Sequence, residues 1–218
     1  MSRRLSRPPE RLIADASGAT IIEFALALPL LLTLGLFGAE IATLAVTQMQ
    51  VSQIALSLAD NASRLGQTDN SGVTPTIRDA DVDAVIDGAM RQGDAIDLLD
   101  NGRVILSSVE YDSTRRRQYI HWQRCRGGLN VQSSYGNEGS RNGLTGTILP
   151  PLGMGEQKIT VTGRNAVMFV EVFYDYGGLF GDVFGMGGKR LHQEGAYLVR
   201  DDRNLMPGLT GGNSRSRC

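Results

Sequence analysis

The feature that most constrains this chain is an apolar run close to its amino terminus. From Phe24 to Ala39 no residue is charged, and after Glu40 the chain stays uncharged until Asp60. A helix from Ala19 to Leu44, rising about 1.5 Å per residue, would span roughly the 30 Å of a bilayer core. The sequence therefore predicts one membrane-spanning helix.

The charges on either side of the apolar run predict its orientation. Basic residues precede the run, and the next basic residue after it is Arg64; those before it are Arg3, Arg4, Arg7 and Arg11. By the positive-inside rule the leader stays in the cytoplasm and the rest of the chain is exported. A secretory signal peptide fits less well, because the helical pattern continues through the small residues 39–45 that a signal peptidase would need.

A glycine stands ahead of the apolar run. Gly18 is followed by "ATII" and then by Glu23 and Phe24. This pattern, after a basic leader, resembles the processing site of type IV prepilin-like proteins, most closely the TadE-like and TadF-like minor pilins of the tight-adherence (Tad/Flp) pilus. The resemblance implies that a membrane-embedded prepilin peptidase cuts between Gly18 and Ala19.

Glu23 is unusual because a lone carboxylate at the edge of hydrocarbon costs a few kcal/mol. Cleavage would create an α-amino group on Ala19 that is positively charged near neutral pH. The resemblance implies that Glu23, the fifth mature residue, meets the amino terminus of a neighbouring subunit. The alternative is that Glu23 reaches towards the lipid headgroups by itself.

The helix is expected to continue beyond the membrane, over residues 19–66 in all. Glu40 is interpreted as an interfacial charge where the helix leaves the lipid. Beyond it, a stripe recurs at steps of three and four residues, either packing on the chain's own domain or contacting another pilin. Its members are Ile41, Leu44, Gln48, Val51, Ala55, Leu58, Ala62 and Leu65.

The remainder of the chain predicts an α+β domain. A glycine- and proline-containing segment after Leu65 ends the long helix, and residues 77–90 have the spacing of a short amphipathic helix with an acidic first turn. Segments 102–112, 116–125 and 165–176 are rich in β-branched and aromatic residues, which favours strands, the first two as an antiparallel hairpin. "KITVTG" and "AYLVR" are expected to extend this small antiparallel sheet.

The two cysteines are Cys125 and Cys218. In an oxidising compartment such a pair indicates one disulfide between the end of the chain and its middle. The second hairpin strand carries "WQRC", Trp122 to Cys125, followed by Gly127, which resembles an element of TadE-like domains, and the resemblance implies the pair Cys125–Cys218. The alternative is a free Cys218 that links subunits.

Two glycine-rich segments are predicted to be loops. Residues 126–157 are polar and are expected to form a long surface loop. Residues 176–190 mix glycine with large apolar side chains, so their tip is expected either to contact a partner subunit or the membrane, or to fold back on the sheet.

Several kinds of chemistry are not supported by the sequence. The net charge is −1 without a basic stripe, which argues against nucleic acid. The acidic run at 79–90 has Ala84 where an EF-hand needs glycine, and the glycine-lysine pair at 188–189 has Val183 where a P-loop needs glycine. His121 and Cys125 are too few for a metal site, and no nucleophile with its base is visible. We therefore expect neither catalysis nor a cofactor.

The resemblance as a whole implies a structural minor pilin or pilus assembly protein. Residues 1–18 would be the leader, 19–66 the transmembrane and extended helix, and 67–218 a periplasmic domain held at the inner membrane. Its partners would be the prepilin peptidase, other Tad pilins and the pilus assembly platform. The Trp122–Cys125 element favours a TadE-like over a TadF-like role. A periplasmic enzyme or binding domain on an uncleaved anchor, or an assembly factor for envelope secretion, remains the alternative.

Overall fold

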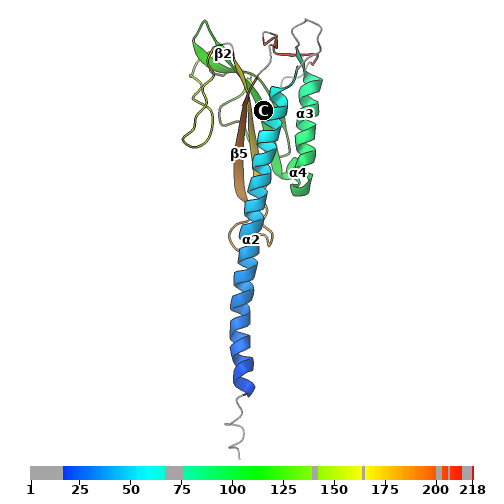
Figure 1. Cartoon of the computed structure of the whole chain (residues 1–218), viewed down its shortest axis with the longest axis vertical. Coiled ribbons are helices and arrows are strands. Elements are labelled where there is room, and N and C mark those ends of the chain that lie inside the picture. The colour runs from blue at the N-terminus through cyan, green and yellow to red at the C-terminus, as the bar shows by residue number, and fades with distance from the viewer. Residues whose placement is uncertain are drawn as a thin grey trace, which may run out of the picture.

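One long helix, α2, dominates the computed structural model (Figure 1). It covers Ser17–Ser63, 47 residues, and therefore extends about 70 Å. Its second half lies against a small domain, and its first half projects from that domain as a single helix. The structure describes residues 17–66, 76–138, 142–163, 165–199, 203–205, 207–212 and 218.

The domain contains short helices and two sheets. The helical segments are α3, Asp79–Gln92, the 3₁₀ turn η1, Asp94–Ile96, and α4, Leu98–Asn101. The strands are β1, Ile77–Arg78; β2, Gly102–Asp112; β3, Arg117–Arg126; β4, Ala166–Tyr176; β5, Lys189–Leu198; and β6, Leu209–Thr210.

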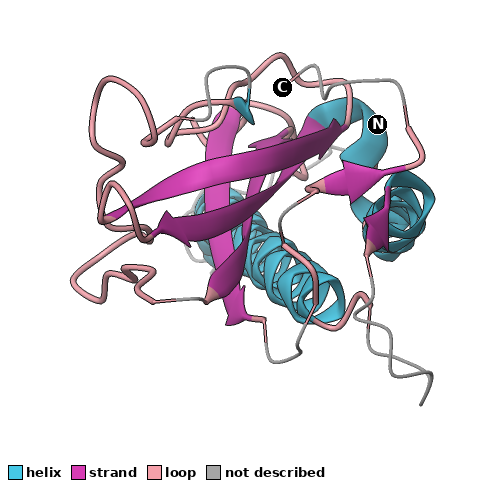
Figure 2. Ribbon diagram, turned by 90° about the horizontal axis from the view of Figure 1, so that it is seen from above, coloured by secondary structure: helices cyan, strands magenta, loops and turns pink. Residues whose placement is uncertain are grey.

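The main sheet has the order β3-β2-β4-β5, and every neighbouring pair in it is antiparallel. Figure 2 shows its strands from above, together with the helices packed beside them. The short strands β1 and β6 pair in parallel apart from this sheet. A long amino-terminal helix followed by an antiparallel sheet is the predicted α+β class, which is confirmed.

The two faces of the sheet are covered differently. Even-numbered residues of β4, from Ala166 to Tyr176, form one core with α2 and α3. Odd-numbered residues of β4, such as Val167 and Phe169, face a second, smaller core. That core includes Leu149 and Leu152 of the segment between β3 and β4. The predicted surface loop therefore covers the second face of the sheet and buries several of its own side chains.

The stripe on α2 packs on the chain's own domain, which decides between its two predicted roles. Val51, Ala55, Leu58 and Ala62 are buried as expected. Nearer the amino terminus the buried positions are displaced by one residue, because Glu40 and Thr47 face the domain while Ile41 and Gln48 are exposed. Because Glu40 and Thr47 are polar, the sequence did not predict that these two positions belong to the buried stripe.

The backbones of α2 and the sheet approach closely at Gly195 of β5. A Cβ atom built on this glycine would lie 2.5 Å from the carbonyl oxygen of Ala55, which is nearer than any real Cβ contact. Only glycine lets the strand backbone lie directly on the helix backbone. The pairing of Gly195 with Val170 places this contact well inside the β4–β5 ladder.

Two strands differ from the sequence prediction. "KITVTG" forms no strand and contributes only an isolated bridge between Ile159 and Leu152. In contrast, β5 begins at Lys189, well before the predicted "AYLVR". The polar first half of β5 has no apolar alternation, so periodicity did not detect it.

The acidic turn of α3 contacts β3 through ion pairs. Asp79 accepts hydrogen bonds from the guanidinium of Arg124, with 3.1 Å between Nε and Oδ1. Further along the helix, Asp83 and Asp87 lie 3.6 and 3.2 Å from Arg126. The carboxylates therefore do more than favour the helix amino terminus, because they also join α3 to the edge strand.

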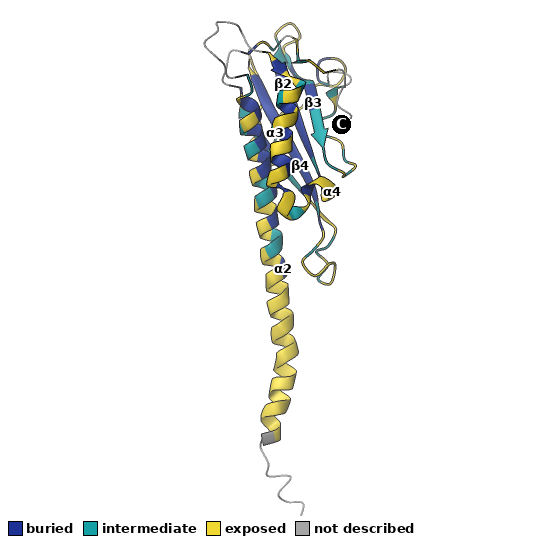
Figure 3. Cartoon of the chain, turned by 90° about the vertical axis from the view of Figure 1, so that its right-hand side faces the viewer, coloured by how far each residue is buried: buried dark blue, intermediate teal, exposed yellow. Residues whose placement is uncertain are grey.

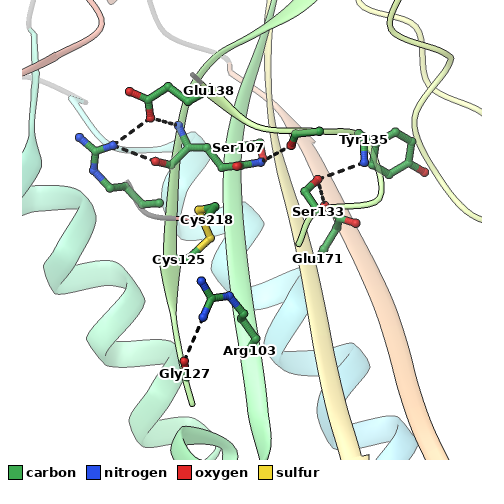
Figure 4. The surroundings of a disulfide bond; sticks show 12 residues. Arg103, Ser107, Cys125, Gly127, Ser133, Tyr135, Glu138, Glu171 and Cys218 are labelled. Atoms are coloured by element: carbon green, nitrogen blue, oxygen red, sulfur yellow. Dashed lines mark hydrogen bonds and ion pairs between the residues drawn. A yellow bond between two sulfur atoms is a disulfide. The ribbon is translucent and has the colours of Figure 1, made fainter. Parts of the chain in front are cut away.

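Cys125 and Cys218 form a disulfide, as the resemblance implied, with 5.6 Å between their Cα atoms. Figure 4 shows the bond beside Arg103, whose guanidinium donates to the carbonyl of Gly127 at 3.3 Å. The bond joins the end of the chain to β3. A disulfide also indicates a compartment outside the reducing cytoplasm.

Replacing Gly195 with alanine should destabilise the domain. The added Cβ forces the α2 and β5 backbones apart, which we expect to lower the free energy of unfolding by about 1–3 kcal/mol. Gly88→Ala is the matched control, because a Cβ there meets nothing within 4 Å and glycine costs a helix interior about 1 kcal/mol. Denaturant unfolding of the full chain in detergent, followed by the fluorescence of the single Trp122, measures both. Equal stability of the two variants would contradict the contact.

Cys218→Ser should lower the free energy of unfolding by up to about 4 kcal/mol, because the disulfide closes a loop with a sequence separation of 93 residues. Cys125→Ser should lower the free energy of unfolding by the same amount, and the double variant should lower it no further than either single variant. The same fluorescence assay measures this. Disulfide-linked dimers of the wild type on a non-reducing gel would instead favour a link between subunits.

Candidate assembly helix and its contacts

The first half of α2 is apolar and exposed on every side. Leu30, Leu31 and Leu32 are 71, 61 and 56% exposed, and successive residues point about 100° apart around a helix. Figure 3 shows this half as a continuous exposed stretch that ends where the domain begins. The helix is long and apolar enough to cross a membrane. A helix that is apolar all round requires lipid or other helices as its surroundings.

The predicted processing and assembly residues lie together at the free end of this half. Gly18, Ala19, Glu23 and Phe24 occupy the first two turns of α2 and are exposed. Among the residues that the structure describes, the Glu23 carboxylate has neither a hydrogen bond nor an ion pair. Residues 1–16 of the predicted leader lie outside the described residues. The predicted disulfide lies at the opposite end of the molecule, within the domain.

Pro29 does not interrupt α2, which runs unbroken from Ser17 to Ser63. A proline removes one backbone donor from a helix. One turn later the hydroxyl of Thr33 donates to the carbonyl oxygen of Pro29 at 2.8 Å. Thr43 and Thr47 make the same kind of bond to the carbonyls of Ala39 and Thr43. Their hydroxyls are therefore satisfied by the helix itself.

Glu40 was predicted to be an interfacial charge, and it marks the point where α2 meets the domain. The side chain is fully buried. Its Oε1 accepts hydrogen bonds from the hydroxyl of Tyr176 at 2.8 Å and from the backbone N–H of Leu179 at 3.1 Å. Its Oε2 accepts one from the N–H of Phe180 at 3.1 Å. A carboxylate tolerates burial when several donors surround it in this way.

These contacts hold residues 177–188, here termed the collar, against α2. The collar connects β4 to β5 and lies across the helix at the lower edge of the domain (Figure 1). Phe184 packs edge-on against Phe37 of α2, with 5.6 Å between ring centroids, and also against Phe180. Of the predicted alternatives for this segment, it folds back, but on the helix instead of the sheet. Leu179 and Val183 remain 51 and 76% exposed beside the apolar half of α2.

A second buried cluster lies on the far face of the sheet, and the sequence analysis missed it. Glu171 of β4 lies opposite Glu194 of β5, and Nε2 of His192 is 3.6 and 3.7 Å from their respective Oε1 atoms. The only sequence signal was the spacing of His192 and Glu194, which puts both on one face of a strand. That signal was lost because this part of β5 was not predicted as a strand.

Neighbouring groups orient the carboxylates of this cluster. The hydroxyl of Ser133 donates to Glu171 (Figure 4), and the N–H of Ser134 donates to the same carboxylate at 2.9 Å. The hydroxyl of Tyr135 donates to Glu194 at 3.2 Å. Burial raises the pKa of Glu194, with the charge of His192 acting in the opposite direction. Burial also raises the pKa of Tyr135 to about 12, so this hydroxyl stays protonated.

The other histidine does not form such a cluster. His121 Nδ1 lies 2.9 Å from a single carboxylate, that of Glu110. Cys125, which the sequence placed near it as a conceivable ligand, is in the disulfide. His121 is therefore an ordinary partner of one acid.

Glu40→Ala should release the collar from α2. Two collar amides lose a charged acceptor, so we expect the hydrogen exchange of Leu179 and Phe180 to accelerate about tenfold or more. Glu23→Gln on the same helix is the control, because Glu23 lies far from the collar and should leave this exchange unchanged. Hydrogen–deuterium exchange with mass spectrometry of the full chain in detergent measures both. Unchanged protection in Glu40→Ala would mean that the aromatic contacts alone hold the collar.

Comparisons of this chain with protein-family models, with curated proteins and with solved structures find no match. Its relationship is therefore described by its architecture. The chain has a long apolar amino-terminal helix whose first half is exposed and whose second half packs on an antiparallel sheet. This arrangement is pilin-like.

Proposed function

We propose that this chain is a TadE-like minor pilin or assembly protein of a Flp-type adhesion pilus. The observation that carries the proposal is the division of α2 at Glu40. Beyond this residue one face of the helix belongs to the domain core, and before it the helix is exposed and predominantly apolar, with Phe37 in contact with the collar. Such a half-helix supports insertion in the inner membrane first and packing among other pilin helices later.

The processing step follows from the position of Gly18. A prepilin peptidase cutting between Gly18 and Ala19 removes the basic leader and keeps the whole apolar half of α2. The cut also creates the α-amino group of Ala19, a cation near neutral pH. Gly18 is exposed in the first turn of α2. The expected partners are thus the peptidase, other Tad pilins and the assembly platform.

Assembly then uses Glu23 and the small residues of the exposed half. In an apolar helix bundle an unpaired carboxylate is penalised, so Glu23 selects a neighbour that presents a free amino terminus. Gly35 and Gly38 have nothing within 4 Å of a built Cβ and leave room for close helix contact. In this proposal the protein performs no catalysis itself, and the domain is displayed in the periplasm or on the pilus.

The mass of the native protein from a membrane fraction tests the processing step. We expect the chain to begin at Ala19, and Gly18→Leu should leave insertion intact while blocking both cleavage and pilus-dependent attachment. Thr20→Val, a neighbouring substitution outside the cut site, should be processed normally. A working protein that still begins at Met1 would instead support a periplasmic domain on an uncleaved anchor.

Glu23→Gln separates assembly from processing. The variant should be cleaved normally but fail to enter pili, because the neighbour's amino group loses its carboxylate partner. Asp60→Asn is the matched control on the same helix. Within the described part of the chain the Asp60 carboxylate pairs with the exposed Arg64 alone, so the exchange should cost a few tenths of a kcal/mol. Quantification of the protein in sheared pili measures both. Normal incorporation of Glu23→Gln would contradict the role of this carboxylate.

A further inference from the structure

The cluster of Glu171, His192 and Glu194 has the composition of a metal site and no role in the proposed function. One potential ligand atom from each residue lies within 4.8 Å of the others. Ligands held about 2.0–2.2 Å from one ion lie roughly 3–4 Å from one another. The distances of 3.6 and 3.7 Å between His192 Nε2 and the two carboxylate oxygens fall in this range.

A second observation is that two polar atoms of the cluster are left without hydrogen bonds. Among the described residues, Oε2 of Glu194 and Nε2 of His192 are buried and form no hydrogen bond, although Nε2 lies within ion-pair distance of both carboxylates. The Glu194 side chain is only 6% exposed, and that of Glu171 is fully buried. Buried polar atoms almost always form hydrogen bonds, so a carboxylate oxygen and an imidazole nitrogen that both lack them in one place require an explanation.

The charges of the cluster are also out of balance. Two buried carboxylates face one imidazole, and within the described part of the chain neither carboxylate forms an ion pair with a lysine or arginine. Even a protonated His192 would leave one negative charge uncompensated. Uncompensated charge is costly in such surroundings. A divalent cation would neutralise both carboxylates and leave the imidazole neutral, as a ligand must be.

The surroundings resemble the outer shell of a metal site. Ser133 and Ser134 donate to Glu171, and Tyr135 donates to Glu194, so both carboxylates are oriented from outside. The His192 ring stacks on Phe173, with 4.1 Å between centroids, which fixes its plane. A groove of about 310 Å³ is lined in part by Glu194, so the cluster borders a cavity on this side.

We infer that Glu171, His192 and Glu194 bind one divalent transition-metal ion of the zinc class. An imidazole with two carboxylates suits Zn²⁺, and Mn²⁺ should bind more weakly by the general order of affinities. Ca²⁺ and Mg²⁺ prefer oxygen ligands alone. The ion would join β4 to β5 and, through Ser133 and Tyr135, hold the segment that covers this face. This inference does not depend on the proposed pilus function.

Zinc titration of the full chain in detergent tests the site. The chain is purified without a histidine tag, stripped with a chelator, and titrated against a chromophoric zinc chelator. We expect one Zn²⁺ per chain. Tyr135→Phe should weaken binding roughly 10- to 100-fold, the usual cost of losing an outer-shell partner, and His192→Gln should weaken it further. Ca²⁺ should not compete.

His121→Gln is the matched control, because His121 contacts one carboxylate and should leave zinc binding at the wild-type value. The fluorescence of Trp122, buried in the other core, reports whether each variant is folded. X-ray absorption at the zinc edge of the wild type, which needs no variant, should show nitrogen and oxygen ligands with one imidazole. Three results would overturn the site: less than one zinc ion per chain, sulfur ligands in the absorption spectrum, or an unchanged zinc affinity in a folded His192→Gln. The cluster would then be a simple ion pair.

Discussion

The packing of the second half of α2 on β4 and β5 is the contact on which the rest of the structure depends. It is a contact between backbones as well as side chains, because Gly195 allows the carbonyl of Ala55 to lie directly on the strand. The even-numbered face of β4 and the buried stripe of α2 form one continuous core. Since the sheet covers the helix only as far as Glu40, the same contact defines the half of α2 that must find other surroundings.

The two glutamates of α2 show how environment separates the roles of identical side chains. Glu40 receives three hydrogen bonds from the collar and Tyr176, so its charge is compensated within the chain. Glu23 lies on the exposed half, where the described residues offer it no partner. If lipid or neighbouring helices surround that half, the missing partner must come from another molecule. The fold therefore supplies hydrogen-bond donors to Glu40, whereas Glu23 is left to pair with another molecule during assembly.

The face of the sheet that points away from α2 is covered by a smaller core that combines apolar and polar contacts. The segment between β3 and β4 covers it with a small apolar core and with polar contacts centred on Ser133, Tyr135 and Gln123. A glycine-rich segment can follow the sheet closely because it has few side chains to accommodate. Its hydroxyls and amides orient the buried acids of β4 and β5. This explains how a segment with the composition of a surface loop contributes to the interior.

Several features were predictable because they depend on local pattern. The long helix, the hairpin of β2 and β3 and the central strand β4 follow from uninterrupted apolar or β-branched segments. The first half of β5 was missed because its residues are mostly polar and show no alternation of apolar and polar side chains. The burial of Glu40 was missed because its donors come from a segment about 140 residues further along the chain.

The sequence by itself therefore determined the existence and length of the helix, the α+β class and the charge asymmetry across the apolar run. These properties belong to continuous stretches of chain, and each stretch carries its own signal. Only the tertiary structure decided which face of α2 is buried, where the domain stops along it, and that Glu171 lies beside His192 and Glu194. Those facts depend on strand pairing between distant segments, and no local periodicity encodes which polar side chains such pairing brings together.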